Sequence, residues 1–122
     1  LKDPRNYTAL VVTPTRELAL QIEEEFKSLT LGMNLYSATF IGGTNINSDL
    51  PKLERKLQVI VGTPGRLLDL SDRRVLDLRK VNTLVLDEFD RMLDMGVVLD
   101  VNKLVKRIGS RDQTRLFSAT FS

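Results

Sequence analysis

The chain has 122 residues, of which 42% are hydrophobic and 28% are charged, and it contains neither Cys nor His. This size and composition support one domain around one apolar core. The missing Cys and His exclude disulfides, thiolate chemistry, His-ligated metals and His general bases, so any catalysis must use carboxylates, hydroxyls, backbone groups, Lys or Arg.

The charge and hydropathy of the chain exclude few classes of binding partner. The formal net charge is +2, so composition alone does not establish nucleic-acid binding. No apolar run approaches the roughly 20 residues that cross a bilayer, and we expect no membrane partner. The lack of Cys is compatible with the cytoplasm, which is the location we expect.

Short apolar runs predict five β-strands. Several are rich in Val and almost continuously apolar, which is typical of strands buried on both faces and therefore of a parallel sheet. The runs are Thr8–Thr13, Tyr36–Ile41, Gln58–Gly62, Thr83–Asp87 and Thr114–Ser118.

Apolar residues at helical spacing lie between these runs and predict amphipathic helices. Alternating strands and helices predict a doubly wound α/β domain, with a mainly parallel sheet flanked by helices on both faces. Ligands of such sheets gather at the carboxyl ends of the strands, so functional residues are expected just after the apolar runs. The helical sets are Leu18, Ile22, Phe26 and Leu29; Ile46, Leu50, Leu53 and Leu57; and Val97, Val101, Leu104 and Ile108.

Two strand ends repeat one phrase, Thr-Pro-x-Arg followed by a helix, at Thr13–Arg16 and Thr63–Arg66. One interpretation is helix capping, with Thr at the N-cap and Pro at the first helical position. The other is phosphate binding, because a helix N-terminus offers free N–H groups and Arg adds a bidentate donor. Two such turns on one edge would hold successive phosphates of one strand. The residues alone leave both interpretations open.

Two further loops follow predicted strands. Gly42 and Gly43 would let a ligand approach the backbone closely, although an ordinary loop is the plainer interpretation. The ligand interpretation gains weight only because the two glycines lie on the same predicted edge. Ser118 and Thr120 follow the last strand, where their hydroxyls could bond nearby carboxylates, but this tripeptide carries little information by itself.

The sharpest signal is an apolar strand that runs directly into Asp87, Glu88 and Asp90. An Asp at a strand end beside a nucleotide can hold a Mg²⁺ ion that bridges phosphates. The Glu that follows can orient or deprotonate an attacking water. The alternative is an acidic turn that caps the next helix, but acids this close repel one another unless a cation compensates them.

One nucleotide-binding motif is missing from the sequence. The phosphate-gripping loop G-x-x-x-x-G-K-[ST] does not occur, and none of the seven glycines precedes Lys-Ser or Lys-Thr.

Taken in order, these motifs resemble those of the DEAD-box ATP-dependent RNA helicases, in the first RecA-like lobe. The resemblance covers essentially the whole chain and includes the spacing and the connecting phrase Asp90–Gly96. It rests on the segments Pro14–Ala19, Gly42–Gly43, Thr63–Arg66, Asp87–Asp90 and Ser118–Thr120.

The resemblance implies hydrolysis of ATP with Mg²⁺, coupled to local unwinding of RNA duplexes. Asp87 would hold Mg²⁺, mostly through water, and Glu88 would position and activate the attacking water. Asp90 would bond with Ser118 and Thr120, which would link hydrolysis to strand separation. The RNA sugar–phosphate backbone would be contacted without sequence preference by Pro14, Thr15, Arg16, Gly42, Gly43, Thr63, Pro64, Gly65 and Arg66.

The chain departs from the family pattern at Phe89, which replaces the usual Ala, and at Val97, which replaces the usual Phe. We expect the first change to leave the chemistry intact and the second to alter packing. The family's adenine-reading segment and phosphate loop would precede Leu1, and its second lobe would follow Ser122. Residues 1–122 are therefore expected to be a partial N-terminal RecA-like lobe that is inactive in isolation.

Two other functions stay open. A non-catalytic RNA-binding or scaffolding lobe is favoured by the missing loop and disfavoured by an intact Glu88. A helicase that acts on DNA is disfavoured by the Thr-Pro-Gly-Arg and Ser-Ala-Thr phrases. In the family, the phosphate-loop strand lies beside the strand that corresponds to Thr114–Ser118. Without it, we expect an open edge and either marginal stability or self-association through that edge.

Overall fold

The computed structural model describes residues 9–109 in full and the backbone of residues 115–119. Within this part of the chain, the strands form one sheet in the order β2-β3-β1-β4-β5, and every adjacent pair is parallel. The expected strands and the parallel sheet are confirmed. The strands are β1 (Ala9–Val12), β2 (Ser37–Phe40), β3 (Val59–Gly62), β4 (Thr83–Asp87) and β5 (Arg115–Ala119).

Helices and short 3₁₀ turns connect the strands. In chain order they are α1 (Arg16–Leu29), η2 (Ile46–Asp49), α2 (Leu50–Leu53), α3 (Pro64–Asp72), η3 (Leu78–Lys80), α4 (Phe89–Asp94) and α5 (Val98–Ile108). None of the helices in this described part of the chain has the length and apolar character needed to cross a membrane.

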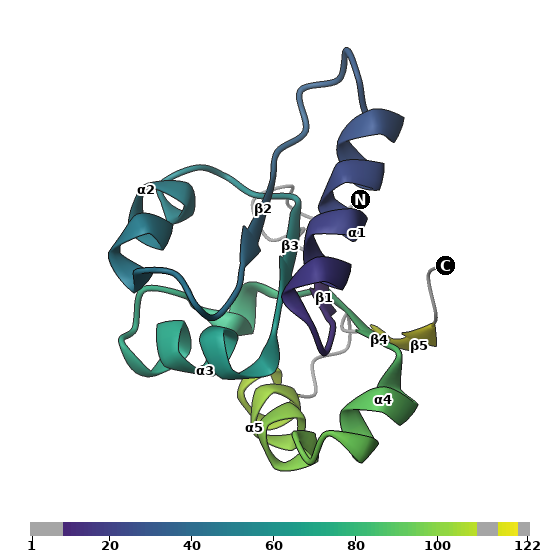
Figure 1. Ribbon diagram of the computed structural model, residues 1–122. Helices are drawn as coiled ribbons and strands as arrows, with labels where there is room; N and C mark the ends of the chain where they lie inside the picture. Colours follow the sequence, from purple (N-terminus) through teal and green to yellow (C-terminus); the bar gives the residue numbers. More distant parts are fainter. Residues whose placement is uncertain (1–8, 110–114, 120–122) are drawn as a thin grey trace.

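Each face of the sheet has its own apolar cluster, because alternate residues of a strand point to opposite faces. On one face, Leu10 and Val12 of β1 join a cluster that includes residues of α3, α4 and α5. On the other face, Val11 packs with Ala19 of α1. Figure 1 shows α3 beside α5, and the two helices are in contact. Helices therefore cover both faces, which confirms the predicted α/β architecture.

The helix expected from Ile46 to Leu57 is wrong in its second half. The 3₁₀ turn η2 is followed by a single α-helical turn, α2, which ends at Leu53. Pro51 lies in the first turn of α2 and has no N–H with which to continue a hydrogen-bond ladder from η2, so the segment forms two short pieces. Leu57 is buried in the core, but it lies in the loop before β3.

The helix expected around Leu18 is confirmed as α1, but its apolar stripe is only partly covered. Ala19 is the buried residue of this helix, and Ile22 packs partly against the same cluster. Leu29, at the far end of the stripe, is 82% exposed. The sheet therefore anchors α1 mainly through its first turns, which lie next to the carboxyl end of β1.

The two outer strands of the described sheet differ in how their edges are covered. The ammonium of Lys52 donates to the Thr39 carbonyl of β2 at 2.9 Å and lies 5.6 Å from the centre of the Phe40 ring. A charged side chain that covers the edge of an outer strand, here from α2, hinders pairing with another chain. At the other end of the sheet β5 pairs with β4, so its expected place at an edge is confirmed for the described residues. Association through β5 stays a prediction.

Gly62 ends β3 where α3 packs closely over the strand. A Cβ atom at this position would lie 2.8 Å from Leu67 Cδ2 and 2.8 Å from the Phe40 carbonyl oxygen. The carbonyl belongs to the neighbouring strand and cannot move without breaking the sheet. The close approach of strand and helix therefore requires Gly here.

We predict that Gly62→Ala lowers the free energy of unfolding by about 1–3 kcal/mol, because the added methyl group overpacks this contact. Gly65→Ala is the matched control, since a Cβ there has no atom within 4 Å. It should leave stability unchanged or slightly higher, because Ala is the better helix former. Urea denaturation of both variants measures the difference, and equal losses would contradict the packing argument.

Candidate functional site

The carboxyl ends of four strands lie level with one another at one edge of the sheet. Val12 of β1 is in register with Gly62 of β3 and with Leu86 of β4, and Phe40 of β2 is in register with Gly62. The loops that follow these strands therefore begin side by side, although they are far apart in the sequence. The motifs singled out from the sequence occupy these loops.

The first Thr-Pro-x-Arg phrase starts its helix differently from the prediction. Thr13 is fully buried, and its N–H donates to the Gly62 carbonyl at 3.0 Å. Thr13 thus continues the strand, and the expectation that it caps the helix is wrong. Thr15 is the N-cap of α1 instead, and its hydroxyl oxygen accepts from the Leu18 N–H at 3.2 Å.

The second phrase matches the capping interpretation in position. Thr63 is the N-cap of α3 and Pro64 is its first residue, but the Thr63 side chain makes no capping hydrogen bond. The Thr63 N–H donates to the Phe40 carbonyl of β2 at 3.2 Å. The two similar phrases therefore place their arginines differently: Arg16 begins its helix, whereas Arg66 is the third residue of its own.

Arg16 lies directly against the glycine loop. Gly43 has a φ of +86°, a backbone conformation that favours Gly. A Cβ atom at Gly43 would lie 2.9 Å from Arg16 Nη1. Arg16 itself is exposed, as are both Gly42 and Gly43. The structure thus brings together a cationic side chain and an open backbone loop, which the sequence placed only on the same edge.

Arg66 has a different environment from Arg16, because its side chain is only 8% exposed. Its Nη1 lies 2.7 Å from Asp49 Oδ2. Both terminal nitrogens also donate to Thr44: Nη2 donates to the carbonyl oxygen at 2.5 Å, and Nη1 donates to the hydroxyl oxygen at 3.4 Å. Much of the donor fork of Arg66 is therefore used within the protein.

Asp49 was missed in the sequence, although a signal for it was present. It follows Ile46 by three residues and precedes Leu53 by four, so it shares a helical face with the apolar stripe. An acid at a core position of a helix needs a buried cationic partner. Asp49 is 1% exposed and lies in contact with Arg66 and Lys52.

The acidic motif begins in the core and turns sharply outward. Asp87 ends β4, is fully buried, and accepts from the Thr13 hydroxyl on Oδ2 at 3.4 Å. Glu88 follows with φ 53° and ψ 53°, a left-handed conformation that non-Gly residues rarely adopt. Such strained positions cluster at functional sites. The Glu88 carboxylate lies 3.8 Å from Arg91, and Asp90 is exposed in the first turn of α4.

The carboxylate at Asp87 suits Mg²⁺ chemically. This ion keeps several waters and takes one or two protein carboxylates together with phosphate oxygens. In the described residues, no group of three or more His, Cys, Asp or Glu side chains is placed to form an all-protein metal cage. A single hard oxygen donor at a strand end is the arrangement that fits Mg²⁺ bound with a nucleotide.

The expected bonds of Asp90 fall outside what the structure describes. The backbone of Ser118 lies in β5, in register with Leu86 of β4, but its side chain is not described. Thr120 lies outside the described residues. The link from Asp90 to these hydroxyls stays a prediction.

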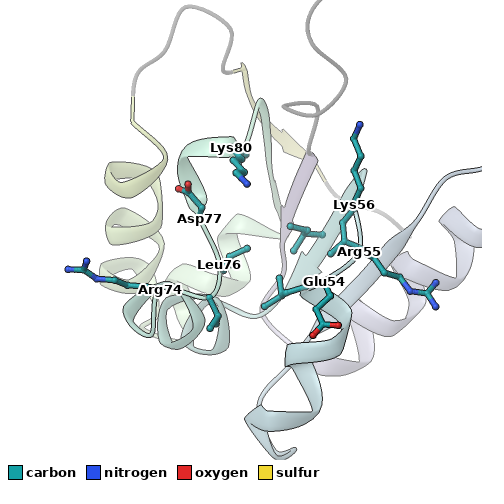
Figure 2. Close-up of a pocket in the computed structure, with 12 residues that line it drawn as sticks. Glu54, Arg55, Lys56, Arg74, Leu76, Asp77 and Lys80 are labelled. Carbon is teal, nitrogen blue, oxygen red and sulfur yellow. The ribbon is translucent and has the colours of Figure 1, made fainter.

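A cleft of about 540 Å³ lies at the opposite edge of the sheet, where β3 and β4 begin. Leu57 and Val81 contribute to it, and Figure 2 shows Arg55 and Arg74 extending away from each other on its two sides. A side-chain hydrogen bond from Arg79 holds the pKa of Asp77, at its rim, below the usual value. No residue predicted to be functional lines this cleft.

Comparison with known proteins gives one consistent family. The sequence model described as DEAD/DEAH box helicase matches residues 1–122. The pre-mRNA-processing ATP-dependent RNA helicase PRP5 of Debaryomyces hansenii is 49% identical over 115 residues, which are 92% of this chain and 13% of that protein. The ATP-dependent RNA helicase CshA of Listeria monocytogenes is 44% identical over 94% of this chain and 22% of its own length. The chain thus spans under a quarter of these relatives.

Solved structures agree with the sequence comparison. A DEAD box protein from Methanococcus jannaschii superposes with a TM-score of 0.84 at 37% identity, over 94% of this chain and 31% of the other. The yeast DEAD-box splicing factor Prp28 gives a TM-score of 0.83 at 27% identity, over 99% of this chain and 30% of the other.

We predict that Arg66→Ala lowers the free energy of unfolding by about 3 kcal/mol, because it leaves a buried carboxylate without its closest cation. Lys52 stays 3.4 Å from Asp49 and limits the loss. Arg73→Ala is the control, since Arg73 and Asp69 form an ion pair in which both side chains are about half exposed. Its effect on urea denaturation should be small. Similar losses in the two variants would show that the buried pair has no special weight.

Proposed function

Because this chain belongs to the DEAD/DEAH box helicase family, we propose that it is part of an ATP-dependent RNA helicase that couples ATP hydrolysis to local unwinding of RNA duplexes. The relatives are several times longer than this chain, so we assign the complete activity to a longer protein with a second lobe. We propose a cytoplasmic location for it. By itself, the segment 1–122, a partial N-terminal lobe without the phosphate loop, should be inactive.

The observation that carries this proposal is the convergence of Arg16, the glycine loop and the N-termini of α1 and α3 on one edge. Helix N-termini offer unpaired N–H groups and a positive dipole end, which favour phosphate. Such groups recognise an RNA backbone without reading its bases.

The exposure of each residue at this edge indicates whether it would contact RNA directly or support the residues that do. Arg16, Gly42, Gly43 and Gly65 are exposed and would contact the sugar–phosphate backbone directly. Thr15 and Thr63 are partly exposed, and the side chain of Arg66 is largely buried. We assign supporting contacts to all three. Pro14 and Pro64 are buried, so they would shape the two turns, and any contact of theirs with RNA would use the backbone.

We assign the nucleotide chemistry to the acidic motif. Asp87 would hold Mg²⁺, mostly through water, and this ion neutralises charge on the phosphates of bound ATP. Glu88 would orient the attacking water and accept its proton, since its left-handed backbone turns it away from the path of β4. Asp90 would form hydrogen bonds with Ser118 and Thr120, and these bonds would couple ATP hydrolysis to the separation of RNA strands. We propose that Phe89, where the family has Ala, leaves the chemistry of these three carboxylates intact.

An ATPase assay distinguishes the proposed RNA helicase from two alternative functions. The first alternative is a non-catalytic RNA-binding or scaffolding lobe. RNA-stimulated ATPase in the longer protein would exclude that role, and its absence would support it. Replacing the RNA duplex by a DNA duplex in the same assay tests whether the enzyme acts on DNA. Light scattering and thermal melts at several concentrations test our proposal that the open β5 edge makes the isolated segment either marginally stable or self-associating.

We predict that Glu88→Gln in the longer protein keeps ATP binding but lowers turnover about 10²-fold or more, because a general base is lost. Single-turnover hydrolysis and nucleotide binding measure the two effects separately. Glu25→Gln is a control, since Glu25 is exposed in the middle of α1, away from the helix N-terminus at the site edge. Turnover within about threefold of the unchanged enzyme would remove Glu88 from this role.

We predict that Gly43→Ala weakens binding of single-stranded RNA about tenfold and equally across sequences, because the methyl group displaces Arg16 and strains the loop. Gly42→Ala adds a methyl group that meets no protein atom within 4 Å, so it leaves Arg16 in place and should cause a smaller loss. Arg16→Ala should weaken binding and flatten its salt dependence, since one phosphate contact is lost. Fluorescence anisotropy at several salt concentrations measures all three variants. Sequence-dependent losses would point to base reading instead.

A further inference from the structure

We propose that Asp49 is a positioning residue for the RNA-binding edge, and that it acts through Arg66 to fix the loop at Gly43 and Thr44. The inference rests on the proposed function, because it presumes that this edge binds the RNA backbone. Asp49 belongs to none of the recognised motifs and lies in the short turn η2, between the glycine loop and α2.

The first link is the pair between Asp49 and Arg66. Their closest atoms, Oδ2 and Nη1, are 2.7 Å apart, and the side chains are 2% and 8% exposed. Water therefore screens this pair only weakly. A guanidinium is a planar fork, so a carboxylate on one nitrogen fixes the direction of the others.

The second link runs from Arg66 to the loop. Arg66 donates to the carbonyl and the hydroxyl of Thr44. The Thr44 hydroxyl also donates to the carbonyl of Ile41, the buried residue that precedes the two glycines. Both ends of the glycine loop are thus tied, with the left-handed Gly43 and its neighbour Arg16 between them.

Energetics argue that this pair has a role besides stability. Burying two charges is costly, and an apolar pair of similar volume at such a site is often as stable or more stable. Stability alone therefore does not explain why a charged pair occupies this site. What an apolar pair cannot do is hold the Thr44 carbonyl and orient donors at the end of β3. The Asp49–Arg66 pair does both.

The sign of the charge makes the inference testable. Asp49→Asn removes a negative charge near a phosphate-binding edge, and electrostatics alone would then tighten RNA binding. Loss of positioning would weaken it, since a misplaced loop no longer presents its N–H groups and Arg16 together. The two accounts predict opposite changes in RNA affinity.

The test uses the longer helicase that contains this chain. We expect Asp49→Asn to raise the Kd for single-stranded RNA about tenfold, and to raise the RNA concentration for half-maximal ATPase stimulation by a similar factor. The ATPase rate at saturating RNA should stay within about twofold. Asp69→Asn makes the same change of charge at an exposed pair in α3, and it should bind RNA as tightly as the unchanged protein or more tightly. Unchanged or tighter binding by Asp49→Asn would overturn the inference.

Two further variants keep the result interpretable. In the double variant Asp49→Asn with Arg66→Lys, the losses should not add, because Asp49 acts through Arg66; full additivity would overturn the inference. If Asp49→Asn does not fold, Thr44→Val carries the test, since Thr44 is exposed. This change removes the hydroxyl but no charge, and should weaken RNA binding roughly threefold; no change would again overturn the inference. Arg16→Ala reports on the edge itself: if it too has no effect, the proposed function fails rather than the role of Asp49.

Discussion

Parallel pairing in level register is the constraint on which the rest of the structure depends. Because Val12 is aligned with both Gly62 and Leu86, three loops separated by tens of residues leave the sheet at the same height. Thr13 shows how tightly they are joined, since its N–H bonds β3 and its hydroxyl bonds the carboxylate that ends β4. The edge that we assign to RNA and the acidic motif that we assign to nucleotide therefore meet at one buried residue.

The sequence was informative wherever one short segment decided the outcome. Runs such as Thr83–Asp87 are apolar on both faces, so they predicted both the strand and its central place. Long-range contacts were beyond such reasoning. Nothing local distinguishes the buried Arg66 from the exposed Arg16, because the difference comes from a carboxylate 17 residues earlier in the chain. Pro51 also divided a helix that the apolar spacing alone had made continuous.

The two arginines show how one phrase can serve two purposes. Arg16 is exposed at the start of α1 and lies against Gly43, so its charge is accessible to a ligand. Arg66 is the third residue of its helix, and its guanidinium is bonded to the carboxylate of Asp49 and the carbonyl of Thr44. An exposed cation and a buried cation that is bonded within the protein have opposite surroundings. The fold provides both within a few residues of two adjacent strands.

The lysine that covers β2 also affects how readily another strand could pair with this edge of the sheet. Since the Lys52 ammonium occupies the Thr39 carbonyl, a new strand beside β2 would first have to displace a charged group from its hydrogen bond, its ring contact and Asp49. At the other end of the described sheet, β5 pairs with β4 on one side only. A strand from another molecule that approached β2 would therefore have to compete with a charged side chain for the Thr39 carbonyl before any ladder of backbone hydrogen bonds could form.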